Sequence, residues 1–137
     1  MKHILFITLL LSAIHLPLTG QPEFKVVSSQ DRLTSASEHI SGHFDQIAVY
    51  TKGLVCSSCG IGLRVHLKKV GEIDRGQFNK GIKLDASNQL IIIAFKEGTQ
   101  PNPEAVHKAI DDAGYEAAHY YQWNGESVSV HSFGKVE

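Results

Sequence analysis

Apolar and polar positions alternate residue by residue in the first stretch that is expected to be ordered, which begins near residue 44. Ile47, Val49 and Thr51 are separated by Ala48 and Tyr50, and a period of two residues is typical of a strand. The alternation stops at the glycine in position 53. We therefore predict a first strand that ends just before a glycine-containing loop.

The pattern changes to that of a helix over residues 57–70. Positions 59, 63, 67 and 70 are apolar and share one face of a helix. Gly71 directly follows this stripe and is placed to end the helix. The loop after the first strand is therefore expected to lead into a helix.

Three further elements follow along the chain. Residues 81–86 and 90–95 are rich in apolar side chains and are separated by a Ser-Asn turn, which predicts a hairpin. A second helix is predicted over residues 103–113, because Asn102 is a good N-cap and the apolar positions recur at helical spacing. Residues 116–123 are predicted to form the last strand of this set.

The order strand, helix, strand, strand, helix, strand predicts an α+β fold over residues 44–123. Two helical crossovers onto one sheet give a ferredoxin-like βαββαβ sandwich, with a four-stranded antiparallel sheet and both helices on one face. Beyond this domain, Asn124-Gly125 is a strong hairpin signal and valine alternates with polar residues after it. The segment 124–137 is therefore either an extra C-terminal strand or a polar tail.

The N-terminal residues have the pattern of an export signal. Lys2 precedes an apolar run over residues 4–14, and small residues follow near Gly20, where cleavage is expected. The run is shorter than the roughly 20 apolar residues of a membrane-spanning helix, so no span is expected in the mature chain. We therefore expect residues 1–20 to be a signal peptide of a periplasmic or secreted protein. Residues 21–43 contain five serines and weak periodicity, and are interpreted as a flexible linker.

Charge and composition narrow the function. The formal net charge is −1 with the histidines neutral, and 42% of the residues are hydrophobic, as in an ordinary globular protein. The chain has no basic excess with which to bind phosphate backbones. Nucleic acid is therefore not expected as a partner.

Cys56 and Cys59 are the only cysteines among the 137 residues, and they occupy the loop between the first strand and the first helix. Soft ions such as Cu(I) and Hg(II) prefer thiolate ligands, and Cu(I) is satisfied by few of them. Backbone N–H groups and the helix dipole at such a junction stabilise negative sulfur. We expect the pair to bind Cu(I), with Hg(II) or another soft ion as the alternative.

The histidines do not complete a recognisable metal site. A closed structural zinc site needs four ligands, and no Cys/His spacing elsewhere in the chain is that of a zinc finger. His66 and His107 fall within the predicted helices and are interpreted as surface or packing residues. Four other histidines cannot be placed from the sequence, and any one of them could join the metal: His39, His43, His119 and His131.

With these elements in place, the chain resembles a heavy-metal-associated domain, the metal-binding module of copper chaperones, copper-transporting ATPases and the periplasmic mercury-binding protein. The family motif Gly-Met-Thr-Cys-x-x-Cys stands here as Gly-Leu-Val-Cys-Ser-Ser-Cys at residues 53–59. The family's Ala-Gly-Tyr turn matches residues 113–115, and the resemblance covers about residues 46–122. Leu54 stands where the family has methionine, and Val55 where it has threonine.

The resemblance implies that Cys56 and Cys59 hold the metal, while Leu54 and Tyr115 lie next to it without binding it. The residues themselves leave two roles open for Tyr115, which either shields the metal loop or is an ordinary tyrosine at the edge of the core. The implied partners are the metal ion and a metal-transporting membrane protein or another chaperone. No catalytic residue or cofactor is expected.

The leading hypothesis is an exported protein that carries or sequesters Cu(I) and is not an enzyme. The alternative is a thiol–disulfide oxidoreductase, with Cys56 as the nucleophile and Cys59 as the resolving thiol. A third reading makes the pair a structural disulfide of a binding module, because exported proteins oxidise such pairs.

Overall fold

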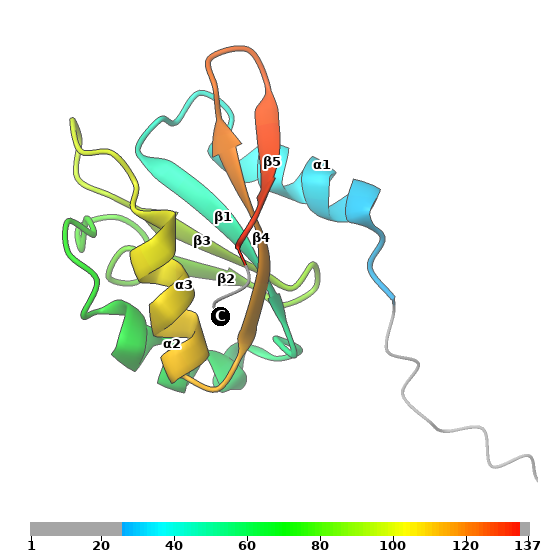
Figure 1. Ribbon diagram of the computed structural model, residues 1–137, viewed down its shortest axis with the longest axis vertical. Helices are drawn as coiled ribbons and strands as arrows, with labels where there is room; N and C mark the ends of the chain where they lie inside the picture. The colour runs from blue at the N-terminus through cyan, green and yellow to red at the C-terminus, as the bar shows by residue number, and fades with distance from the viewer. Residues whose placement is uncertain (1–25, 135–137) are drawn as a thin grey trace, which may run out of the picture.

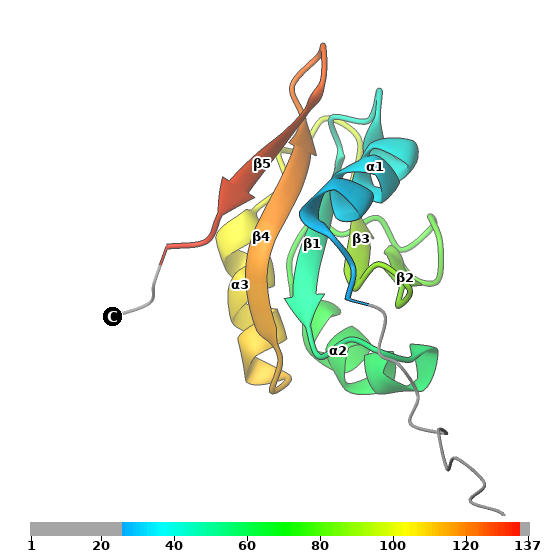
Figure 2. The same cartoon turned by 90° about the vertical axis from the view of Figure 1, so that its right-hand side faces the viewer.

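A computed structural model describes residues 26–134 of the chain. Its elements are helix α1 (Ser29–Ile40), strand β1 (Gln46–Lys52), a 3₁₀ turn (Ser57–Cys59), helix α2 (Gly60–Leu67), strands β2 (Ile82–Asp85) and β3 (Leu90–Ala94), helix α3 (Pro103–Asp112), and strands β4 (Glu116–Trp123) and β5 (Val128–Ser132). Figures 1 and 2 show them as one antiparallel sheet with helices on both faces. The predicted signal peptide lies outside the described residues.

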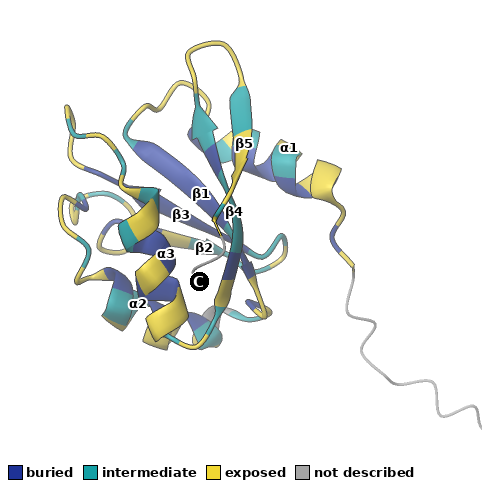
Figure 3. Cartoon of the chain, viewed as in Figure 1, coloured by how far each residue is buried: buried dark blue, intermediate teal, exposed yellow. Residues whose placement is uncertain are grey.

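The predicted βαββαβ fold is confirmed. The strands are hydrogen-bonded in the order β2-β3-β1-β4-β5, with every pairing antiparallel. The first four strands with α2 and α3 are the ferredoxin-like arrangement, in which β1 and β3 lie inside the sheet. Figure 3 shows these two strands buried along almost their whole length.

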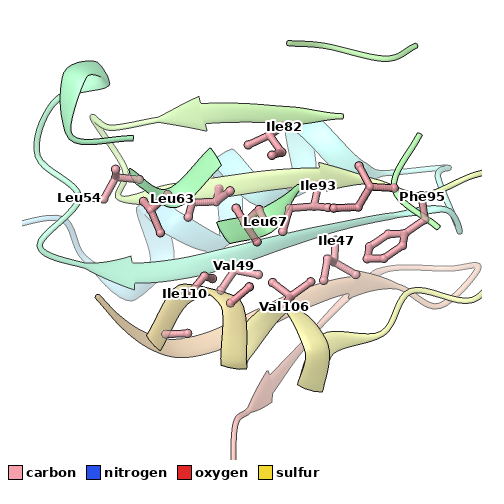
Figure 4. Packing of buried hydrophobic residues seen from close by; sticks show 14 residues of the cluster. Ile47, Val49, Leu54, Leu63, Leu67, Ile82, Ile93, Phe95, Val106 and Ile110 are labelled. Atoms are coloured by element: carbon pink, nitrogen blue, oxygen red, sulfur yellow. The ribbon is translucent and has the colours of Figure 1, made fainter. Parts of the chain in front are cut away.

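The larger hydrophobic core lies between the sheet and the helices α2 and α3. Ile47 and Val49 of β1 face Leu63 of α2 and Ile110 of α3, and all four are fully buried. Figure 4 shows this cluster, with Leu54 and Leu63 together at one end. The core therefore extends to the loop that contains the two cysteines.

The segment 21–43 is not a flexible linker in its second half, and this prediction was wrong there. Helix α1 begins after the N-cap Ser28, whose Oγ accepts a hydrogen bond from the Asp31 amide at 3.0 Å. Ala36 and Ile40 pack against the face of the sheet opposite α2 and α3, next to Tyr121. The sheet is consequently covered on both faces, and not on one as we predicted.

The helix predicted over residues 57–70 is shorter in the structure and begins later. Residues 57–59 form a 3₁₀ turn, and the α-helix runs only from Gly60 to Leu67. Two glycines in its first turn weaken the start of the helix, since each costs roughly 1 kcal/mol relative to alanine. Cys59 therefore ends a tight turn and does not lie within the helix.

At the C-terminal end, the extra strand forms and the polar-tail reading is wrong for residues 128–132. Strand β5 pairs with β4 over five positions, and Asn124 and Ser127 close the hairpin between them. Gly125 has a φ of +105°, which the turn requires and which glycine adopts without strain.

No helix among residues 26–134 is both long enough and apolar enough to cross a membrane.

Candidate metal site

The two cysteines lie on a loop that a buried leucine anchors in the hydrophobic core. Strand β1 ends at Lys52, and Gly53 turns the chain with a φ of +83°. The side chain of Leu54 then points into the core and is fully buried. Leucine in place of the family's methionine thus keeps the apolar anchor of the loop.

Cys56 and Cys59 are brought together at the top of this loop and both are partly exposed. Their Cα atoms are 5.4 Å apart and their sulfurs form a disulfide. The Cys59 amide donates a hydrogen bond to Cys56 Sγ at 3.2 Å. Because an N–H donor stabilises a negatively charged sulfur, this contact favours the thiolate when the pair is reduced.

Tyr115 reaches the same loop from the connection between α3 and β4. Its hydroxyl donates a hydrogen bond to the carbonyl oxygen of Cys59 at 2.9 Å. One ring carbon of Tyr115 also lies beside Gly53, 3.8 Å from where a Cβ would stand. The tyrosine therefore contacts both ends of the cysteine loop, through its hydroxyl at Cys59 and through its ring at Gly53.

An ion pair ties the same two connections together. Lys52 Nζ at the end of β1 lies 2.5 Å from Glu116 Oε1 at the start of β4. The hydrogen bond that Lys52 donates to the Glu116 carboxylate raises the pKa of Lys52 above its ordinary value, so the lysine stays charged. This pair was not predicted, because the sequence does not show which residues of the two strands are neighbours.

Three apolar side chains on the cysteine loop and on α2 are exposed. Val55 is 54% exposed, and Ile61 and Val65 on α2 are 68% and 51% exposed. The helical spacing of the buried positions 63 and 67 implies that neighbouring apolar residues of this helix face outward. The sequence therefore contained a signal for this surface that our prediction did not use.

The described histidines have other contacts and do not gather with the two cysteines into a metal site. His107 is nearly buried and stacks on Phe133 with ring centroids 4.4 Å apart, while His131 stacks on Tyr120 at 4.8 Å. Three further histidines lie next to polar side chains: His39 next to Lys83 and Asp85, His43 next to Asp45, and His119 next to Ser132. His66 lies on α2. Among residues 26–134, no three His, Cys, Asp or Glu side chains gather as a metal site.

The fold and the loop together define an α+β domain that presents a Cys-x-x-Cys pair at one end of the sheet.

No protein-family model matches the chain, and no curated protein matches it. Solved structures do match. The chain is similar to the CopZ metallochaperone, with 15% identity, a TM-score of 0.43, and coverage of 53% of this chain and 98% of that one.

Two further solved structures are similar to the chain. One is a heavy metal binding protein from Thermotoga maritima, with 14% identity, a TM-score of 0.42, and coverage of 56% of this chain and 97% of that one. The other is a copper binding domain from a P-type ATPase, with 22% identity, a TM-score of 0.40, and coverage of 53% and 88%. Likeness at this level does not say what this chain binds.

Proposed function

We propose that this protein binds one soft metal ion, with Cu(I) as the preferred cargo, between Cys56 Sγ and Cys59 Sγ. The observation that carries the proposal is the pairing of two partly exposed sulfurs on a loop fixed by the buried Leu54. Soft thiolates select soft ions. The pair would act as a carrier or a store for the ion, and not as a catalyst.

The donor set favours Cu(I) over zinc. Two sulfurs converge, and no third ligand gathers with them among residues 26–134. Cu(I) accepts such a small soft donor set, whereas a structural zinc site takes four ligands. Hg(II) or another soft ion would fit the same two sulfurs and is the alternative cargo.

Loading requires the reduced pair. The disulfide must gain two electrons and two protons to give two thiols, for example from a dithiol protein that becomes a disulfide in turn. The thiols then lose protons as the ion binds. Metal binding and the disulfide are therefore mutually exclusive states of the same two sulfurs.

The exposed position of the pair also supports transfer of the ion. A partner can reach the pair, because Cys56 and Cys59 are partly exposed and Val55 and Ile61, close to them in the sequence, are exposed. We propose a metal-transporting membrane protein or another chaperone as this partner. An exposed pair that holds a soft ion weakly enough to release it needs a second protein with soft ligands to receive it.

Titration with Cu(I) against a competing chromophoric chelator tests the binding proposal. Reduced protein comprising residues 21–137 should take up one tight equivalent. Residues that only orient a metal ligand contribute roughly 10- to 100-fold to metal affinity. The Cys56→Ser/Cys59→Ser variant removes both ligands, so its Cu(I) affinity should fall by more than that. Ser58→Ala, an exposed change within the same turn, is the matched control and should bind as wild type. Equal uptake by wild type and the double-serine variant would overturn the proposal.

We also propose that the protein is exported, on the basis of the signal-like residues 1–20. Expression with the native N-terminus should yield a processed chain outside the cytoplasm that begins near residue 21. Mass spectrometry of the fractionated cells measures both its location and its first residue. An unprocessed chain found in the cytoplasm would contradict the proposal.

The disulfide favours a second candidate function, a thiol–disulfide oxidoreductase. Both cysteines are partly exposed and are oxidised to each other, as in the resting state of such an enzyme. Cys56 would attack a substrate disulfide and Cys59 would resolve the mixed disulfide. Insulin reduction that is lost in Cys56→Ser would support this function, while absence of activity in wild type would remove it.

A further inference from the structure

Strand β5 forms one edge of the sheet, and among residues 26–134 no strand pairs with its outer side. Figure 2 shows β5 at the rim, beyond β4. Edge strands present unpaired backbone N–H and C=O groups, which act as a template for another strand. This edge is distinct from the cysteine loop and has no part in the proposed metal binding.

The register with β4 shows which backbone groups point outward. The Asn124 amide donates to the Ser127 carbonyl at 3.1 Å, so these two residues form a hydrogen-bonded pair. Hydrogen-bonded and non-hydrogen-bonded pairs alternate along an antiparallel ladder. Val128, Val130 and Ser132 therefore occupy non-hydrogen-bonded positions opposite β4, and their N–H and C=O groups face the free edge.

The two edges of the sheet differ in their protection. At the other edge, β2 has only four residues, includes Lys83 and Asp85, and is preceded by a bridge between Asn79 and Ile82. Such short and charged strands resist pairing with another chain. Strand β5 has five residues, pairs with β4 without a bulge, and contains neither proline nor any Asp, Glu, Lys or Arg.

We propose that β5 is a self-association edge, where a second copy of this chain adds its own β5 in antiparallel orientation. Centring the two-fold axis on Val130 pairs Val130 with itself and Val128 with Ser132 of the other copy. Every outward-facing N–H and C=O of these three residues then gains a partner. Ser129 lies opposite His131 of the second copy, and no formally charged Asp, Glu, Lys or Arg side chain meets its own copy across the axis.

The chemistry of the strand favours a second copy over a charged partner. The stretch from Ser127 to Gly134 has no Asp, Glu, Lys or Arg, and Val130 in its centre is 50% exposed. Valine is a strong strand former, and two valines meeting across the axis add an apolar contact. Five residues of edge pairing bury less than the roughly 1,200 Å² of a stable interface, so the dimer forms only at high protein concentration.

Sedimentation velocity of metal-free, oxidised protein (residues 21–137) over a range of concentrations tests this proposal. Wild type should shift from the monomer mass towards twice that mass as concentration rises. Val130→Pro should remain a monomer, because proline removes an outward N–H that β4 does not use. Val130→Thr keeps the N–H and the β-branched shape, and should dimerise as wild type does.

Amide chemical shifts supply a measurement that does not depend on a variant folding. In wild type, the Val128, Val130 and Ser132 amides should shift with concentration more than the Ser129 and His131 amides. A monomer at all concentrations, or dimerisation of a folded Val130→Pro that equals wild type, would overturn the proposal. Shifts at the same amides caused only by an extended peptide of foreign sequence would overturn it too, and would assign the edge to a different partner. Because the measurement uses metal-free protein, its outcome is independent of the Cu(I) titration.

Discussion

At the residue scale, the cysteine loop depends on side chains that hold it from both sides. Leu54 anchors it in the core, and the Tyr115 hydroxyl binds the Cys59 carbonyl. The position of Tyr115 after the second predicted helix placed it at this end of the fold, whereas the role of Leu54 came from the resemblance to heavy-metal-associated domains. The sequence did not predict the Lys52–Glu116 pair, because that contact depends on the register between two distant strands.

Replacing Tyr115 with phenylalanine should separate these roles. Tyr115→Phe keeps the ring and loses one hydrogen bond, which lowers the free energy of unfolding by about 1 kcal/mol. The looser loop should weaken Cu(I) binding by up to roughly tenfold, as for other groups that orient a metal ligand. Chelator competition measures the affinity and urea denaturation measures the stability. Tyr121→Phe, on the opposite face of the sheet, should leave Cu(I) affinity unchanged, and an equal loss there would contradict this role for Tyr115.

The first turn of α2 provides a matched pair of glycines. A Cβ on Gly60 would collide with Cδ1 of Leu84, whereas a Cβ on Gly62 would meet nothing within 4 Å. Gly62→Ala should raise the free energy of unfolding by up to about 1 kcal/mol through helix propensity. Gly60→Ala should be less stable than Gly62→Ala by at least about 1 kcal/mol, because Leu84 must move. Thermal or urea denaturation of the two variants makes the comparison, and equal gains would show that Leu84 yields freely.

At the element scale, the strong patterns were predicted and the weak one was missed. Helix α3 has a capped start and a clear apolar stripe, and it spans Pro103–Asp112 as expected to within one residue. Helix α1 buries small and polar residues such as Ser35 and Ala36 against the sheet, so its sequence lacks a wide apolar face. The signal that could have shown it was Ser28 followed three residues later by Asp31, an N-cap pattern.

The packing of α1 against the sheet gives a stability prediction. Ile40 is fully buried in the second hydrophobic cluster with Ala48 and Tyr121. Ile40→Ala should lower the free energy of unfolding by roughly 2–5 kcal/mol, because it removes apolar contacts and leaves a cavity. Thr34→Ala on the exposed side of the same helix is the control and should change it by less than about 0.5 kcal/mol. Similar small effects in urea denaturation of both variants would mean that α1 does not dock in solution.

A second prediction concerns Asp85, which joins α1 to the turn between β2 and β3. Its carboxylate accepts hydrogen bonds from Ser35 Oγ at 2.7 Å and from Asn88 Nδ2 at 2.7 Å. Burial alone would raise the pKa of Asp85, but the hydrogen bonds from Asn88 and Ser35, with a smaller effect of His39, outweigh it and place the pKa below its ordinary value. The folded state therefore binds this proton less readily than the unfolded state does.

The direction of the pH effect follows from that difference. The contribution of Asp85 to stability is fully present above its unfolded pKa of about 3.9, and is lost as the pH falls through the lower folded pKa. Asp85→Asn should cost about 1 kcal/mol at neutral pH, and its difference from wild type should shrink in acid. Urea denaturation at neutral pH and at several values below about 4 measures this. A difference that stays constant with pH would show that the carboxylate charge does not stabilise α1.

At the scale of the whole molecule, the order of strands and helices was predictable and the number of layers was not. The βαββαβ order follows from local periodicity, and it alone places the β1–α2 loop and the α3–β4 turn at one end. The closure of the second face by α1 and the widening of the sheet by β5 come from segments with short or weak patterns. Packing against the sheet determines the structure of such segments, and their local sequence pattern is too weak to predict it.

In the proposed function, one Cu(I) ion is held by the two sulfurs of this loop and by no other side chain. X-ray absorption spectroscopy of the reduced, Cu(I)-loaded protein tests the claim most directly, because it reports the atoms bound to the metal. A two-sulfur site should give sulfur neighbours only, and this signal should be lost in Cys56→Ser/Cys59→Ser. A spectrum with nitrogen neighbours from histidine, or one that is unchanged in the double-serine variant, would contradict it.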